Sequence, residues 1–218
     1  MMLDFSWLPD AWGAILYGLS MAIYILAVTA TLGTVASVLG ATLRRSRFVI
    51  VRTIMAAYVE ICRNTPFLAQ LFFVFFGLPS LGIRLDPVTA AIVAMTLNFA
   101  AYGTEIIRGG IDAVPRGQSE AGMALGLAHY LIFLKIILPQ ALKVIFPALA
   151  SQIVIAFLDT AAVSQISVME LTYQADLLQV RTYRPFEVYA FITIVYLVFA
   201  IALRKLLYGS YHLAYGAR

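Results

Sequence analysis

Three polar side chains lie within long apolar stretches, namely Gln70, Asn98 and Asp159. Polar groups are costly in hydrocarbon, so those that occur there usually face a cavity, a partner helix or a ligand. The Asp159 carboxylate could pair with the α-ammonium or a cationic side chain of an amino acid. The alternative is a structural partner, either Thr160 or a residue of a neighbouring chain.

Asn98 and Gln70 are weaker candidates for contact with the same ligand. Asn98 lies about 11 residues, or about 16 Å, into its apolar stretch, so it could share a cavity with Asp159. Its alternative role is a hydrogen bond between two helices. Gln70 lies one helical turn beyond Pro66, where a proline can disturb the helix and free carbonyl groups for a polar ligand.

Two acid–base pairs have helical i, i+3 spacing, Glu60 with Arg63 and Glu105 with Arg108. Oppositely charged side chains at this spacing lie on one face of a helix and can form an ion pair. We interpret both pairs as structural or gating elements rather than as ligand contacts.

The composition indicates the environment of the elements that carry these residues. Of 218 residues, 62% are hydrophobic and 12% are charged, and the mean hydropathy is +0.92. This balance is far from that of a water-soluble domain, and apolar stretches of about 20 residues, enough to span a bilayer, recur along the chain. The sequence therefore predicts a multi-pass, all-α integral membrane protein.

Signals of catalysis and of cofactor binding are absent from the sequence. There is no G-x-x-x-x-G-K-[ST] phosphate loop and no H-E-x-x-H pair. The two histidines, His129 and His212, are not part of a triad, and the single cysteine, Cys62, cannot form an internal disulfide. We expect a protein that is not an enzyme and that holds no metal or cofactor of its own.

We expect five transmembrane helices in one membrane domain, residues 14–208, between an outer segment, residues 1–13, and a cytoplasmic tail, residues 209–218. The predicted spans are Ala14 to Leu43, Met55 to Leu81, Pro87 to Ile107, Val144 to Met169, and Val188 to Leu203.

Basic residues are distributed unevenly between alternate connections, which predicts the orientation. The N-terminus is expected outside and the C-terminus in the cytoplasm, and the net charge of +4 follows from this arrangement without a nucleic-acid partner. The cations on the expected cytoplasmic side are Arg44, Arg45, Arg47, Arg52, Arg108, Arg116, Lys135, Lys143, Arg204, Lys205 and Arg218, against Arg84, Arg181 and Arg184 outside.

The cytoplasmic connection, about residues 112–138, has helical periodicity. We expect a short helix from Ser119 to Leu127 and a second amphipathic piece from Leu131 to Leu138, closed by Pro139. The connection from Glu170 to Glu187 is mixed polar and aromatic and is expected to be an outer loop.

The cytoplasmic connection contains the sequence EAGMALGLAHYLIFLKIILP, from Glu120 to Pro139. It resembles the EAA loop of ABC importer permeases, in which this loop forms the coupling helix that docks on the ATPase subunit. The resemblance assigns the coupling role to Glu120, Ala121, Gly122 and Gly126. Small residues allow close backbone approach to a partner, and an acidic Glu120 near a helix N-terminus would suit the helix dipole.

Two further segments resemble the permeases for polar amino acids, whose substrates include histidine, arginine, glutamine, glutamate, cystine and opines. They are ICRNTPFLAQLFFVFFGLP, from Ile61, and LNFAAYGTEIIRGGIDAVPRGQSEAG, from Leu97. One departure is that the Lys-Asp-Thr-Ser-Leu of many relatives is Leu158 to Ala162 here, without the lysine. The missing lysine and Asp159 favour a cationic or zwitterionic substrate.

The resemblance implies a type I importer permease fold in a bacterial inner membrane. It also implies a second permease chain, two ATPase subunits that bind ATP and Mg²⁺, and an external solute-binding protein. A channel or secondary carrier that works without ATP is the alternative, because composition and Asp159 fit it equally. A scaffold without transport would leave Gln70, Asn98 and Asp159 without a role.

Overall fold

The computed structural model describes residues 3–216, and this part of the chain is built from helices without strands. The ends of the expected outer segment and tail, including Arg218, lie outside the described residues. The helices are α1 (Leu8–Arg44), α2 (Val49–Arg63), α3 (Phe67–Phe72), α4 (Pro87–Asp112), α5 (Arg116–Ala124), α6 (His129–Ile132), α7 (Leu138–Asp159), α8 (Leu171–Thr182) and α9 (Pro185–Tyr215).

Four helices are long and apolar enough to cross a membrane, and a broken pair gives a possible fifth span. The four are Leu8–Arg44, Pro87–Asp112, His129–Ile166 and Pro185–Leu213. The broken pair, Val49–Arg63 with Phe67–Leu81, bends by 111°. The segment expected as the second span, Met55 to Leu81, is therefore bent rather than straight, because Pro66 has no N–H to continue the α-helical ladder.

Two other expectations about boundaries also differ from the structure. α6 continues through a π-helical turn, Phe133–Ile137, into α7, so Pro139 does not end a separate piece. The carbonyl to which Pro139 cannot donate in an α-helix is that of Lys135, four residues earlier, and it falls within the π-helical turn. The connection after Glu170 is not a loop throughout, because it contains α8.

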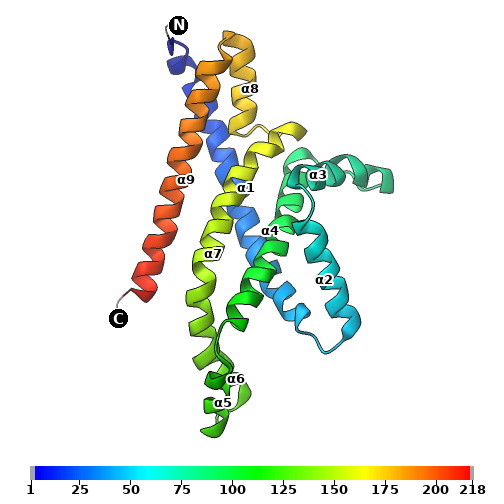
Figure 1. Cartoon of the computed structure of the whole chain (residues 1–218). Coiled ribbons are helices and arrows are strands. Elements are labelled where there is room, and N and C mark those ends of the chain that lie inside the picture. Colours follow the sequence, from blue (N-terminus) through cyan, green and yellow to red (C-terminus); the bar gives the residue numbers. More distant parts are fainter. Residues whose placement is uncertain (1–2, 217–218) are drawn as a thin grey trace.

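α1 and α4 pack along their lengths at the centre of the molecule, and α7 lies against α4 (Figure 1). Small residues allow the close approach of α1 and α4, as is common between membrane helices. A Cβ atom added to Gly103 of α4 would lie 2.0 Å from Ser37 Oγ of α1, and one added to Gly33 would lie 2.5 Å from the Phe99 ring. The core between them contains Ala22, Ile25, Ala91, Ala94, Phe99 and Phe157.

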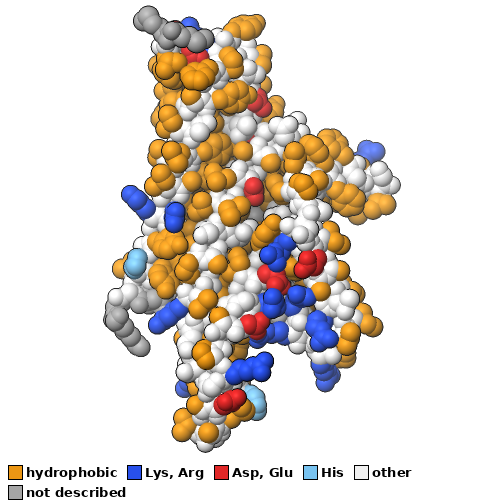
Figure 2. Space-filling model, in the orientation of Figure 1, with side chains coloured by type: hydrophobic (Ala, Val, Ile, Leu, Met, Phe, Trp, Pro, Cys, Tyr) orange, Lys and Arg blue, Asp and Glu red, His pale blue; other side chains and the backbone are white. Residues whose placement is uncertain are grey.

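The N-terminus and α8 lie at one end of the molecule, and α5 and α6 lie at the opposite end (Figure 1). Side chains of Lys and Arg gather mainly in the lower half of the same view, around the ends of α1, α2 and α4 (Figure 2). The molecule therefore has two chemically different ends, joined by an apolar body.

Glu170, whose side chain is fully buried, holds α8 in place through two hydrogen bonds. Its Oε1 accepts a hydrogen bond from Tyr173 N at 2.9 Å, which caps α8, and its Oε2 accepts one from the Tyr196 hydroxyl of α9 at 2.6 Å. Burial raises the pKa of Glu170 from 4.5 to about 7, against the opposing effect of the Tyr196 hydrogen bond. One carboxyl group thus both caps α8 and joins it to α9.

Gly18 allows α8 to dock on α1, since a Cβ added there would lie 2.9 Å from the Cα atom of Leu171. The obstacle is backbone, so it cannot rotate away. We expect Gly18→Leu to lower the free energy of unfolding by about 1–3 kcal/mol through overpacking. The measurement is the thermal unfolding midpoint in detergent. Gly13→Leu on the same helix is the control, because a Cβ at Gly13 meets nothing within 4 Å; equal midpoints for the two variants would contradict this account.

The raised pKa of Glu170 predicts a pH-dependent stability. Its folded pKa exceeds its unfolded value, so its contribution to stability is complete below pH 4.5 and is lost as the pH rises to about 7. The whole effect corresponds to about 3 kcal/mol for this shift. We expect Glu170→Gln to flatten the unfolding midpoint measured across this pH range. The partly exposed Glu187→Gln is the control and should retain the wild-type slope.

Candidate functional site

α3, α4 and α7 surround a small pocket that contains two of the three sequence-predicted ligand residues. Asn98 comes from α4 and Asp159 from the end of α7. The residues that line the pocket are Phe67, Met95, Asn98, Phe99, Gln152, Ala156 and Asp159. It therefore combines an apolar wall with an amide and a carboxylate.

Asp159 is half-buried, and within residues 3–216 its carboxylate has no hydrogen-bond or ion-pair partner. The Thr160 hydroxyl, one of the alternatives considered for it, donates instead to the Phe157 carbonyl oxygen at 2.6 Å. A carboxylate that is withdrawn from water gains much from a cation that reaches it. Asp159 is therefore the described pocket residue whose charge lacks a partner.

Gln70 lies behind Asn98 and makes its hydrogen bonds within the chain. Its Nε2 donates to the Cys62 carbonyl oxygen at 2.8 Å and to the Thr65 hydroxyl at 2.9 Å. In a continuous helix that Cys62 carbonyl would accept from residue 66, but Pro66 has no N–H. The carbonyl freed by the proline is thus satisfied by Gln70 and is not left for a ligand.

The other end of the Gln70 amide orients Asn98. Asn98 Nδ2 donates to Gln70 Oε1 at 3.1 Å, and the Asn98 side chain is buried. The hydrogen bond between helices that was the alternative role for Asn98 is present, and Asn98 also lines the pocket with Asp159. Gln70 itself faces a neighbouring apolar pocket that it shares with Cys62, Phe73 and Leu97.

Gln152 is a pocket residue that was not identified from the sequence. It lies on α7 about two helical turns before Asp159, so both side chains are on one face of the helix. Its side chain is buried and borders the same pocket. The signal that would have revealed it is a second polar residue at this spacing in an otherwise apolar helix.

Of the two predicted ion pairs, one is present. Arg108 Nη2 lies 2.6 Å from Glu105 Oε2, which confirms that pair. The pair of Glu60 with Arg63 was wrong. Glu60 accepts a hydrogen bond from Asn64 Nδ2 at 3.0 Å, and the Arg63 guanidinium lies over the Tyr102 ring at 5.6 Å.

The segment with the EAA spacing forms α5 and its C-terminal turn at the far end of the molecule (Figure 1). Glu120 and Ala121 are exposed. α5 begins at Arg116, earlier than the expected Ser119, so Glu120 lies beyond the first turn. The expected effect of the helix dipole on Glu120 was therefore wrong, because that effect is confined to the terminal turn.

The two glycines of this segment have roles within the chain. Gly126 has φ +74° and ends α5: Gly126 N donates to the Met123 carbonyl at 2.9 Å, and Leu127 N donates to the Gly122 carbonyl at 3.1 Å. This is a Schellman cap, which favours glycine at the left-handed position. A Cβ at Gly122 would lie 2.9 Å from Ile132, so Gly122 packs α5 against the following helix.

Large apolar side chains surround the end of α5 on the outside. Met123, Leu125 and Tyr130 have exposed fractions of 47%, 78% and 65%. Together with Glu120 and Ala121 they form a mixed apolar and acidic surface, which we call the α5 surface. Its exposed apolar groups fit a protein partner rather than water.

Known proteins resemble the chain over most of its length. The family described as "Binding-protein-dependent transport system inner membrane component" matches residues 33–211. The arginine transport system permease protein ArtQ of Bacillus subtilis is 38% identical, over 80% of this chain and 82% of its own. The glutamine transport system permease protein GlnP of Escherichia coli is 32% identical, over 95% of each chain.

The fold also matches solved structures. The crystal structure of an amino acid ABC transporter with histidines superposes with a TM-score of 0.90 at 35% identity, over 95% of this chain and 97% of that chain. An inward-facing MetNI methionine ABC transporter superposes with a TM-score of 0.69 at 21% identity, which supports the fold alone. With the family match over residues 33–211, these likenesses place the chain in the family of inner membrane components of binding-protein-dependent transport systems, as a permease subunit of an ABC importer and not an enzyme.

Proposed function

We propose that this permease subunit imports amino acids, cationic or zwitterionic, through a pathway that includes the pocket of Asp159 and Asn98. The observation that carries the proposal is the Asp159 carboxylate, which is withdrawn from water and has no partner among the described residues. Every amino acid presents an α-ammonium group that can pair with this carboxylate. Asn98, oriented by Gln70, and Gln152 offer amide groups to the rest of the substrate.

Related proteins support this choice of substrate class. Permeases named for arginine, glutamine and octopine transport align with most of this chain. These substrates differ in their side chains but share the α-amino-acid framework, with a secondary amine in octopine. A binding group that all of them can use must contact the common part, and a carboxylate at Asp159 has the charge to pair with the shared amine.

The topology that we propose has five spans, with the broken helix pair as one of them, the N-terminus outside and the C-terminus in the cytoplasm of a bacterial inner membrane. The support is the concentration of Lys and Arg at the end that carries α5 (Figure 2). In this orientation the α5 surface faces the cytoplasm, and α8 faces outward.

The α5 surface is the proposed contact with an ATPase subunit, through Glu120 and Ala121, with Gly122 and Gly126 shaping the helix from behind. Two ATPase subunits would bind ATP and Mg²⁺, and an outer solute-binding protein would deliver the substrate. One chain encloses too small a pathway, so a second permease, identical or similar, completes it. Membership of a binding-protein-dependent family favours this importer over a carrier that works without ATP.

Substitution of Asp159 tests the ligand role. We expect Asp159→Asn to weaken binding of radiolabelled arginine and glutamine by about 10- to 100-fold, because the ammonium loses its partner charge. The measurement is equilibrium binding to the purified permease–ATPase complex without binding protein. Asp10→Asn, which removes an exposed carboxylate from α1, is the control. Wild-type affinity in Asp159→Asn would exclude this residue from the site.

Charge reversal at Glu120 tests the ATPase contact separately. We expect Glu120→Lys to abolish most substrate-stimulated ATP hydrolysis in proteoliposomes, since it places a cation in the α5 surface, and to reduce co-purification of the ATPase subunit. Glu187→Lys makes the same charge change at the start of α9, at the end of the molecule opposite to α5. It should leave both ATP hydrolysis and co-purification of the ATPase subunit unchanged. If the two variants behave alike, the α5 surface is not the contact.

A further inference from the structure

α4 contains a weak point immediately before the coupling segment. Its last residues are Arg108, Gly109, Gly110, Ile111 and Asp112, and α5 begins after a short connection. Glycine in a helix interior is less stable than alanine because it loses more backbone freedom. A Cβ at Gly109 would meet nothing within 4 Å, so packing does not require glycine there. This part of α4 can therefore bend more easily than the rest.

Gly110 differs from Gly109 in having a packing role. A Cβ added to Gly110 would lie 2.2 Å from Ile145 Cγ1 of α7. α4 and α7 therefore approach closely at Gly110, while the open side of the helix at Gly109 is not supported by a neighbour. Resistance to bending at this point must come from other interactions.

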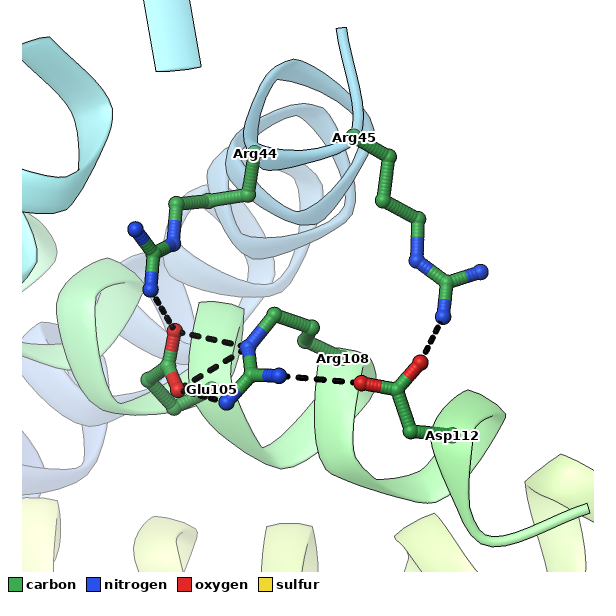
Figure 3. Close-up of polar contacts among 5 residues, drawn as sticks. All are labelled: Arg44, Arg45, Glu105, Arg108 and Asp112. Carbon is green, nitrogen blue, oxygen red and sulfur yellow. Dashed lines mark hydrogen bonds and ion pairs between the residues drawn. The ribbon is translucent and has the colours of Figure 1, made fainter. Parts of the chain in front are cut away.

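A network of five charged side chains spans the two glycines (Figure 3). On α4, Arg108 binds Glu105 at 2.6 Å and Asp112 at 2.9 Å, and the second of these pairs bridges Gly109 and Gly110. From the end of α1, Arg45 pairs with Asp112, and Arg44 Nη2 lies 3.3 Å from Glu105 Oε1. Asp112 is thus held on the far side of the glycines by one cation from each helix.

We propose that Arg45 and Asp112 are positioning residues that brace the Gly109–Gly110 segment, so that displacement of α5 moves α4 and α1 together. This inference rests on the proposed coupling role of α5. Without the brace, α4 would bend at the glycines, and a movement imposed on α5 by the ATPase would be lost before it reached the pocket at Asn98.

The geometry explains why this brace lies at the end of α1. Up to Thr104, α1 and α4 are joined by close packing of small residues, as at Ser37 and Gly40. Beyond that level the two helices are joined by ion pairs of the longer Arg44 and Arg45 side chains. Arg45 and Asp112 have side-chain exposed fractions of 41% and 48%, so salt can weaken their attraction.

The test measures amino acid transported per ATP hydrolysed, with labelled arginine and the complete complex in proteoliposomes. We expect Asp112→Asn and Arg45→Gln to assemble with the ATPase and to hydrolyse ATP. The transport ratio should fall by about fivefold or more, as for a moderate coupling between two sites. The exchanged pair, Arg45→Asp with Asp112→Arg, should restore part of the ratio, because it rebuilds the ion pair between the ends of α1 and α4 but not the pair of residue 112 with Arg108.

A second arm separates bracing from a general effect on folding. Gly109→Ala stiffens α4 without a clash, so it should raise the ratio in the Asp112→Asn background. Gly117→Ala, in α5 and also free of clashes, should not raise the transport ratio in the Asp112→Asn background. Wild-type ratios in both single variants would overturn the proposal. So would a loss that neither the exchanged pair nor Gly109→Ala restores.

The same assay distinguishes failure of the brace from failure of the proposed coupling site. Glu120→Lys acts at the contact with the ATPase and should lower hydrolysis itself. If Glu120→Lys has no effect while Asp112→Asn lowers the ratio, the contact lies elsewhere and the brace remains. If Glu120→Lys abolishes hydrolysis while Asp112→Asn retains the wild-type ratio, the contact stands and the brace is wrong.

Discussion

Polar groups withdrawn from water must find partners within the protein, and this constraint shapes the whole chain. Several hydroxyl groups in the long helices donate to carbonyl groups of their own helix, as Ser37 does to Gly33 at 2.6 Å. The carbonyl that Pro66 leaves without a donor is taken by Gln70. Buried Glu170 accepts from Tyr173 and Tyr196. The half-buried Asp159 carboxylate, in contrast to Glu170, has no partner among the described residues.

The break at Pro66 links this constraint to the pocket. Because the chain turns by 111° there, α3 approaches α4 near Asn98, and Gln70 can satisfy both the broken helix and the Asn98 amide. A continuous helix would leave no carbonyl for Gln70 to cap. The same proline that interrupts the span thus orients a residue of the candidate binding site.

The two ends of α4 are stabilised by different interactions. Near the pocket, close contacts of small residues with α1 leave little freedom. Near α5, ion pairs replace these contacts, and adjacent glycines weaken the helix. Such a division suits a transport protein, in which a rigid element must carry a movement imposed at one end to a binding site further along the chain.

Much of the architecture follows from the sequence alone. Long apolar stretches determined that the chain is helical and suited to a membrane. The spacing from Glu120 to Pro139 pointed to the importer family. Both features can be recognised from the sequence because each lies within one local segment. Asp159 and Asn98 were identifiable because polar residues are rare in such stretches. The pair of Glu105 with Arg108 was predictable because it is made within one helix.

Tertiary structure decided the features that depend on residues distant in sequence. Three contacts illustrate this, because each joins different helices. They are the hydrogen bond of Gln70 with Asn98, the packing of Gly122 against Ile132 and the ion pair of Arg45 with Asp112. Arg63 could pair with Glu60 by spacing but lies over Tyr102 of another helix. Local periodicity specifies which face a side chain occupies, and packing of the helices decides which partner that face meets.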